Sequence, residues 1–268
     1  MCELLAMSCR YPARLTSSLT ALAGRAGSTR NHDGWGLAIY QGRDVALHRD
    51  ITPAHTSPLV PWLEANGPST TLAVGYIRHA TQGAINLANT GPFTRELNGR
   101  MHVFAHNGNL KNLAQASPVA SRFYRPVGDT DSELAFCLLL DQIRQQVHDS
   151  TEQLPLQTSL ETVINFARTL RTLGPASFLY ADGDVLFAHA DRRLQLSTSQ
   201  VTAPALYRLE CPAGGAALVR NCESENTQTA QRVILLASVP LTDEPWVAMT
   251  EGEILAIQLG AVVASVQL

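Results

Sequence analysis

The chain has 268 residues, of which 45% are hydrophobic and 16% charged, so it can bury a core without a disulfide or metal to hold it together. Its formal net charge of −3 argues against a nucleic-acid-binding surface, which would be basic. No apolar run approaches the roughly 18 residues of a membrane span, and the first residues lack the features of a secretory signal. We therefore expect a cytoplasmic protein that binds neither nucleic acid nor a membrane.

The five cysteines are scattered along the chain and odd in number. None belongs to a C-x-x-C pair, so the sequence predicts neither a zinc site nor a disulfide framework. A reduced thiol therefore stays available for chemistry at any of them: Cys2, Cys9, Cys137, Cys211 and Cys222. We expect only a packing role for Cys9, and the pattern assigns no role to the last three.

The first half of the chain reads mainly as strands with two short helices. Alternating or continuous apolar residues predict strands at Cys2–Ser8, Trp35–Tyr40, Val45–Arg49, Thr70–Arg78 and Arg100–His106. Helical spacing is seen at Arg14–Arg25 and Leu59–Ala65. The intervening segment Ala84–Leu97 is rich in Asn, Gly and Pro, which predicts a loop.

Two helices and a second group of strands follow. Thr130-Asp131-Ser132-Glu133 matches a capping box, and the helix it opens is expected to end near Val147. A second amphipathic helix over Leu156–Leu173 is stopped by Gly174-Pro175. Strands are predicted at Ser177–Ala181, Val185–Ala190, Arg193–Thr198, Leu206–Glu210, Val233–Val239, Ile254–Leu259 and Val262–Gln267. Strands, then helices, then strands suit two stacked sheets with helices outside them.

Cys2 follows the initiator methionine directly. Cysteine is small enough for an aminopeptidase to remove Met1, which would leave a thiol and a free α-amine on one residue. That amine, with a reference pKa of roughly 7.7–8.0, is a base next to a nucleophile. Taken alone, the position is better explained as a buried strand residue, since free cysteine is among the most buried residue types.

Polar residues gather at three places where strands run into loops. Arg78 ends an apolar strand and presents a fork that fits a carboxylate, although a surface ion pair also explains it. Asn107 and Gly108 can form a two-donor oxyanion hole, although an Asn-Gly turn is common after a strand. Asp131 lies in the first turn of a helix, where the helix dipole alone accounts for an acidic residue.

Together these residues form a complementary set for an amino-acid substrate. Arg78 would bind an α-carboxylate, and Asp131 an α-ammonium group. Cys2 would attack an acyl carbon while Asn107 and Gly108 stabilise the oxyanion.

The sequence resembles a class II glutamine amidotransferase domain, whose nucleophile is an N-terminal cysteine. The motifs that carry the resemblance span most of the chain in the family's order: Met1-Cys2, Asn31-His32-Asp33-Gly34-Trp35-Gly36, Gly75-Tyr76-Ile77-Arg78-His79-Ala80-Thr81-Gln82-Gly83, Ala105-His106-Asn107-Gly108-Asn109-Leu110, Gly128-Asp129-Thr130-Asp131-Ser132-Glu133 and Leu236-Ala237-Ser238-Val239-Pro240-Leu241. Members that make amino sugars carry Trp and His where this chain has His79 and Gln82.

The resemblance implies a fold, a site and a reaction. The fold is the αββα sandwich of N-terminal-nucleophile hydrolases, an α+β class, here as a single domain over residues 1–268. Cys2 would form a γ-glutamyl thioester and release ammonia, with its α-amine as base. Asn107 and Gly108 would hold the oxyanion. The substrate would contact Arg78, Asp131, Thr81 and His79, and no metal or organic cofactor is required.

The resemblance to short stand-alone members leaves three functions open. Ammonia from glutamine can pass to a separate synthase subunit. Alternatively, the enzyme hydrolyses a γ-glutamyl peptide or amide with no ammonia acceptor. In a third alternative, the chain is a non-catalytic γ-glutamyl-binding protein. Arg78 and Asp131 would bind the same glutamyl group in each case, so the motifs do not choose among them.

Overall fold

The computed structural model describes residues 2–25, 33–116, 123–147, 154–195, 198–211, 218–221 and 231–268. Met1, Asn31, His32 and Cys222 lie outside the described residues, as does part of the strand expected at Arg193–Thr198.

The first sheet is antiparallel and has β1 near its centre. Its order is β14-β11-β13-β1-β4-β2-β3, with β12 also pairing with β1. The strands are β1 (Glu3–Leu15), β2 (Trp35–Gln41), β3 (Asp44–Asp50), β4 (Thr70–Ile77), β11 (Tyr207–Cys211), β12 (Val219–Asn221), β13 (Val233–Ala237) and β14 (Val247–Ala248).

The second sheet is also antiparallel and runs in the order β16-β15-β8-β7-β6-β5. Its strands are β5 (Phe93–Leu97), β6 (Arg100–Gly108), β7 (Ala176–Ala181), β8 (Leu186–His189), β15 (Glu253–Gln258) and β16 (Ala261–Gln267). A separate short pair joins β9 (Arg193–Leu194) to β10 (Val201–Thr202).

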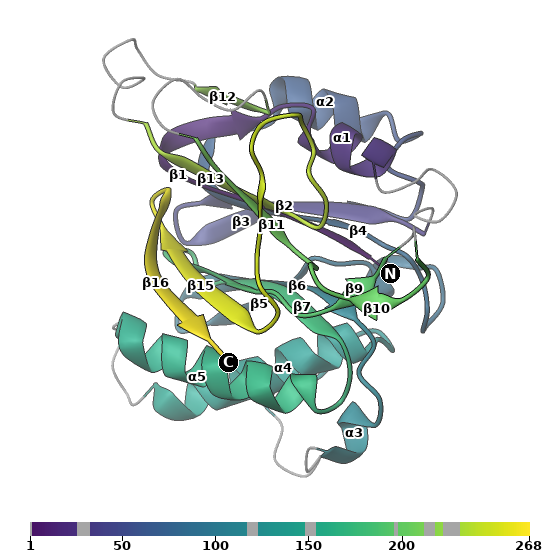
Figure 1. Ribbon diagram of the computed structural model, residues 1–268, viewed down its shortest axis with the longest axis vertical. Helices are drawn as coiled ribbons and strands as arrows, with labels where there is room; N and C mark the ends of the chain where they lie inside the picture. Colours follow the sequence, from purple (N-terminus) through teal and green to yellow (C-terminus); the bar gives the residue numbers. More distant parts are fainter. Residues whose placement is uncertain are drawn as a thin grey trace.

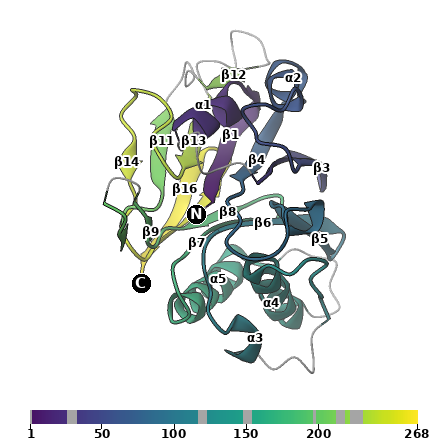
Figure 2. The same ribbon diagram turned by 90° about the vertical axis from the view of Figure 1, so that its right-hand side faces the viewer.

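Helices cover the outer faces of the two stacked sheets, as Figures 1 and 2 show. The first sheet packs against α1 (Ser18–Arg25) and α2 (Leu59–Asn66), and the second against α4 (Asp131–Gln146) and α5 (Leu156–Arg171). Two short helical segments, η1 (Leu87–Asn89) and α3 (Leu113–Ala116), lie in the connections. A third apolar cluster, which includes Leu4, Val74, Ala105 and Leu179, lies between the sheets. The expected αββα sandwich is thereby confirmed.

Three elements, β1, α1 and β5, differ from the sequence-based predictions. β1 runs to Leu15 rather than ending near Ser8, and α1 begins at Ser18 rather than Arg14. The extra length of β1 is held by pairing with β12, about two hundred residues later, which local periodicity does not reveal. The end of the expected loop, Phe93–Leu97, is instead strand β5, because it pairs with the neighbouring β6.

The start of α4 is capped as predicted, but Glu133 acts differently from a capping-box glutamate. The Thr130 hydroxyl accepts the Glu133 N–H at 3.2 Å. The Glu133 carboxylate accepts the N–H groups of Val127 and Gly128 instead of that of Thr130, and it forms an ion pair with Arg95 of β5. Glu133 therefore fixes the loop before the helix to the edge of the second sheet.

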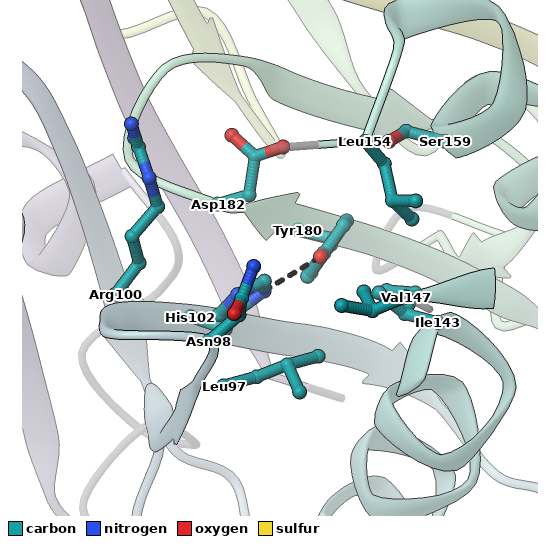
Figure 3. A pocket seen from close by; sticks show the side chains of 10 residues that line it. All are labelled: Leu97, Asn98, Arg100, His102, Ile143, Val147, Leu154, Ser159, Tyr180 and Asp182. Carbon is teal, nitrogen blue, oxygen red and sulfur yellow. Dashed lines mark hydrogen bonds between the residues drawn. The ribbon is translucent and has the colours of Figure 1, made fainter. Parts of the chain in front are cut away.

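His102, buried on β6, makes stability depend on pH. Its Nδ1 lies 2.7 Å from the Tyr180 hydroxyl, in a small enclosed pocket shown in Figure 3. Burial lowers the pKa of His102 from 6.5 to about 4. Below pH 6.5 the unfolded chain therefore binds a proton that the folded chain does not. Stability should fall from about pH 6.5 to about pH 4, by roughly 3 kcal/mol for this group.

Urea unfolding at a series of pH values between those limits tests this expectation. His102→Gln should reduce the dependence of the unfolding free energy on pH, while His189, whose pKa burial also lowers to about 4, keeps its own contribution. The matched control is His55→Gln, because His55 is exposed and its replacement should keep the wild-type slope. Equal slopes for all three proteins would show that His102 does not cause the effect.

Candidate functional site

Cys2 lies directly before β1, at the point where that strand begins between β13 and β4. The hydroxyl of Tyr76 on β4 donates to the Cys2 Sγ at 2.8 Å, and the His79 N–H does so at 3.4 Å. The same sulfur lies 3.5 Å from the His79 carbonyl oxygen, to which a protonated thiol can donate. Two donors directed at one sulfur favour its thiolate form.

Burial disfavours the thiolate form of Cys2. It raises the pKa of the Cys2 thiol above its ordinary value of 9.0, while the hydrogen bonds from Tyr76 and His79 lower it. Burial also raises the pKa of Tyr76 well above its ordinary value, so this hydroxyl keeps its proton and remains a donor. The Cys2 thiol is thus mainly protonated near pH 7, and attack by its sulfur requires a base to take the proton.

Arg78 is buried, with 2% of its surface exposed, and it organises the loop that follows β4. Its guanidinium donates to three carbonyl oxygens of that loop, at 3.0–3.3 Å: Gln82, Gly83 and Ala84. A guanidinium has five N–H donors, so donors remain for a carboxylate. Arg78 therefore shapes the loop that carries His79 and Thr81 and keeps capacity to bind an anion.

The ring of His79 faces an acidic neighbour. Its Nδ1 lies 3.9 Å from the Asp33 carboxylate, and the same carboxylate oxygen accepts the Ala80 N–H at 2.7 Å. Asp33 thereby holds the backbone that supplies the N–H next to the Cys2 sulfur.

Asn107 and Gly108 end β6, in the second sheet. The Asn107 side chain is fully buried, and among the described residues neither its Oδ1 nor its Nδ2 has a hydrogen-bond partner. Leaving both groups unpaired is costly, so a ligand or water that pairs with them would be strongly favoured. A Cβ at Gly108 would lie 1.9 Å from the Pro175 carbonyl oxygen, so this position requires glycine.

Asp131 is the first residue of α4. One of its carboxylate oxygens accepts the Leu110 N–H at 2.7 Å, and the other accepts the Ser132 N–H at 2.9 Å. Asp131 therefore ties the segment after Gly108 to the start of the helix. The dipole of the helix stabilises its negative charge at the same place.

Two open cavities adjoin this loop region: Gln82 lines one and Asn109 the other, and Gln82 Nε2 donates to Asn109 Oδ1 at 2.8 Å. The acidic pocket, about 450 Å³, is lined by residues that include Gln82, Lys111, Asp129 and Asp131. The basic cleft, about 520 Å³, is lined by residues that include Thr81, Gly108, Lys111, Arg171 and Arg192.

These contacts place the predicted site residues in one connected region. Cys2 touches the backbone of His79, and the loop of Arg78 and Thr81 reaches Asn109 through Gln82. Asn109 follows Gly108 directly, and Leu110 bonds to Asp131. Their roles in substrate binding and catalysis remain predictions at this point.

Sequence reasoning missed three neighbours of these residues. Tyr76 is a direct partner of the Cys2 sulfur, and its place on β4, two residues before Arg78, was the available signal. The bond from Gln82 to Asn109 joins two of the motifs already singled out, but neither spacing nor composition indicates that their side chains meet.

Within the described ranges, no three or more His, Cys, Asp or Glu residues are grouped so that they could hold a metal ion. In the same ranges, no helix combines the length and apolar character needed to cross a membrane.

Comparison with known proteins gives consistent matches. The family model for class-II glutamine amidotransferases matches residues 1–268. Two relatives are each described as a "putative glutamine amidotransferase". That of Haemophilus influenzae is 31% identical over 99% of this chain and 87% of its own length. That of Escherichia coli, YafJ, is 33% identical over 94% of this chain and 96% of its own.

Solved structures agree on the fold. A Pseudomonas aeruginosa protein, titled a predicted glutamine amidotransferase, has a TM-score of 0.68 at 31% identity and covers 98% of this chain and 99% of its own. A glutamine phosphoribosylpyrophosphate amidotransferase from Bacillus subtilis matches with a TM-score of 0.63 and 17% identity, over 99% of this chain and 49% of its own. At that identity the second match shows the fold alone.

Proposed function

Because the chain belongs to the class-II glutamine amidotransferase family, we propose that it hydrolyses the γ-amide of glutamine or of another γ-glutamyl compound. The observation that supports this most is the pair of donors, the Tyr76 hydroxyl and the His79 N–H, directed at the Cys2 sulfur. In this proposal residues 1–268 act as one domain, with Cys2 at the N-terminus after removal of Met1. A reactive free thiol suits a reducing compartment, and we place the reaction in the cytoplasm.

The first half of the reaction acylates Cys2. The α-amine of Cys2 accepts the thiol proton, and the sulfur attacks the amide carbon. The Asn107 Nδ2 and the Gly108 N–H donate to the oxyanion that forms, which would pair the amide that is otherwise unsatisfied. The protonated amine then gives its proton to the leaving nitrogen, and the C–N bond breaks. Ammonia or an amine departs and a γ-glutamyl thioester remains on Cys2.

The second half releases glutamate. Water loses a proton to the same α-amine and attacks the thioester carbon. The C–S bond then breaks, and the proton returns to the Cys2 sulfur. Throughout, Asp131 binds the substrate α-ammonium and Arg78 its α-carboxylate, with Thr81 and His79 lining the site. Transfer of ammonia to a separate synthase subunit would use the same first half.

Glutamate release from protein freed of Met1 tests the proposal. Incubation with glutamine and a panel of γ-glutamyl amides and peptides should yield glutamate from at least one of them. Matched protein that keeps Met1 should be nearly inactive, because a peptide bond at the α-nitrogen of Cys2 removes its basicity. If correctly trimmed protein binds γ-glutamyl compounds but turns over none of them, the chain is a binding protein and not a hydrolase.

A further inference from the structure

The basic cleft gathers positive charge beside Gly108, one of the proposed oxyanion donors. Three basic side chains line it, Lys111, Arg171 and Arg192, and none of the lining residues in the described part of the chain is acidic. Gly108 forms part of its wall, so the cleft opens beside the proposed oxyanion hole. The proposed reaction with glutamine uses Thr81 and Gly108 of this lining but assigns no role to its three basic side chains.

Two of the three basic side chains, Arg171 and Arg192, are partly neutralised by nearby carboxylates. Arg171 lies 3.1 Å from Asp191 and 3.0 Å from Glu251, and Arg192 lies 3.7 Å and 3.6 Å from the same two carboxylates. Three positive charges against two negative ones leave the cleft with one positive charge in excess. The described part of the chain gives Lys111 no ion pair, so the excess is centred at this exposed lysine.

The wall that carries these charges is held rigidly. Asp191, fully buried, accepts the Ala176 N–H at 3.0 Å, and its own N–H donates to the Ser177 hydroxyl at 3.0 Å. Two residues later, Arg193 pairs with Glu3 at 2.6 Å inside the protein. The backbone around Arg192 is thus fixed on both sides, and a bound anion would meet a preformed surface.

The position of the cleft indicates which part of a substrate enters it. In the proposed function the α-ammonium group lies with Asp131, in the acidic pocket. In the same function the scissile amide lies between Cys2 and Gly108, and because Gly108 and Asn109 both line the basic cleft, a leaving group would have access to it. Ammonia occupies about the volume of a water molecule, roughly 30 Å³, whereas the cleft measures about 520 Å³.

From this size and charge we propose that the basic cleft is a subsite for a leaving amine that carries a carboxylate. The substrate class is therefore γ-glutamyl amino acids and short γ-glutamyl peptides rather than free glutamine. This inference rests on the proposed function, since it assumes turnover at Cys2. Lys111, at the border of both cavities, would bind the carboxylate of the leaving group.

The test compares two synthetic substrates that differ in a single charge. One is γ-glutamylglycine with its free glycine carboxylate, and the other is the same compound with that carboxylate converted to a carboxamide. Protein freed of Met1 should hydrolyse the carboxylate form with a kcat/KM about tenfold higher, mainly through KM, as one exposed charge-assisted hydrogen bond would give. Lys111→Gln should remove most of this preference, and Lys111→Arg should retain it.

Arg168→Gln is the matched control, because it removes one positive charge from the exposed face of α5, away from the cleft lining. It should keep the wild-type preference, which separates a local subsite from a general effect of net charge. Equal kcat/KM values for the two substrates would overturn the subsite while the proposed hydrolase function stands. Absence of turnover with every substrate would overturn both.

Discussion

Replacing Cys2 with alanine is expected to abolish glutamate release, with a loss on the order of 10⁴-fold or more, because no other group takes over as nucleophile. Cys2 precedes β1 and is only partly buried, so the variant should fold normally. The measurement is the rate of glutamate release by trimmed protein, with thermal unfolding as the check on folding.

Cys9→Ala is the matched control for this variant. Cys9 is buried on the same strand, and its Sγ donates to the Thr70 carbonyl oxygen at 3.2 Å. Its replacement should cost about 1 kcal/mol of stability and leave the rate of release close to that of the wild type. Wild-type rates in Cys2→Ala, or a comparable loss in Cys9→Ala, would refute the assignment of the nucleophile.

The second large effect is expected from Glu3, which directly follows Cys2, the proposed nucleophile. Its carboxylate pairs with Arg193 at 2.6 Å, and Arg193 also donates to the Ser238 carbonyl oxygen at 2.7 Å. Both charged residues are almost fully buried. Burial raises the pKa of Glu3, while the charge of Arg193 lowers it. Glu3→Gln leaves Arg193 without its counter-charge and should lower the free energy of unfolding by about 3–5 kcal/mol.

Denaturant unfolding of matched variants checks the expected loss of unfolding free energy in Glu3→Gln. Glu210 pairs with Arg208 at 3.1 Å on the surface, and Glu210→Gln should cost less than about 1 kcal/mol. The double variant Glu3→Gln with Arg193→Met should be more stable than Glu3→Gln alone, because it no longer buries an unpaired cation. A loss in Glu3→Gln no larger than that in Glu210→Gln would show that the buried pair does not anchor the start of β1.

Much of the site was predictable because its residues lie at strand ends. Arg78 follows β4, Asn107 lies at the end of β6 and Asp131 opens α4, and local patterns reveal all three elements. Hydrogen bonds of the neighbouring residues Gln82, Asn109 and Leu110 connect the three positions. The stacking of two sheets also follows from the order of the elements.

The remaining features depend on contacts between distant parts of the chain. Glu3 and Arg193 are 190 positions apart, and the last three residues of β1, up to Leu15, pair with β12. The hydroxyl of Tyr76 reaches the sulfur of Cys2 because β1 and β4 are neighbours in register, which no local period encodes. These long-range pairings determine the surroundings of Cys2.

Trapping the acyl intermediate tests the central claim most directly. Protein freed of Met1 would be mixed with a γ-glutamyl substrate, quenched in acid within the first turnovers, digested and analysed by mass spectrometry. The account predicts one γ-glutamyl group, carried by the N-terminal peptide on the sulfur of Cys2 and lost on treatment with hydroxylamine. Active protein whose γ-glutamyl group appears on another residue, or that turns over without any acyl adduct, would contradict it.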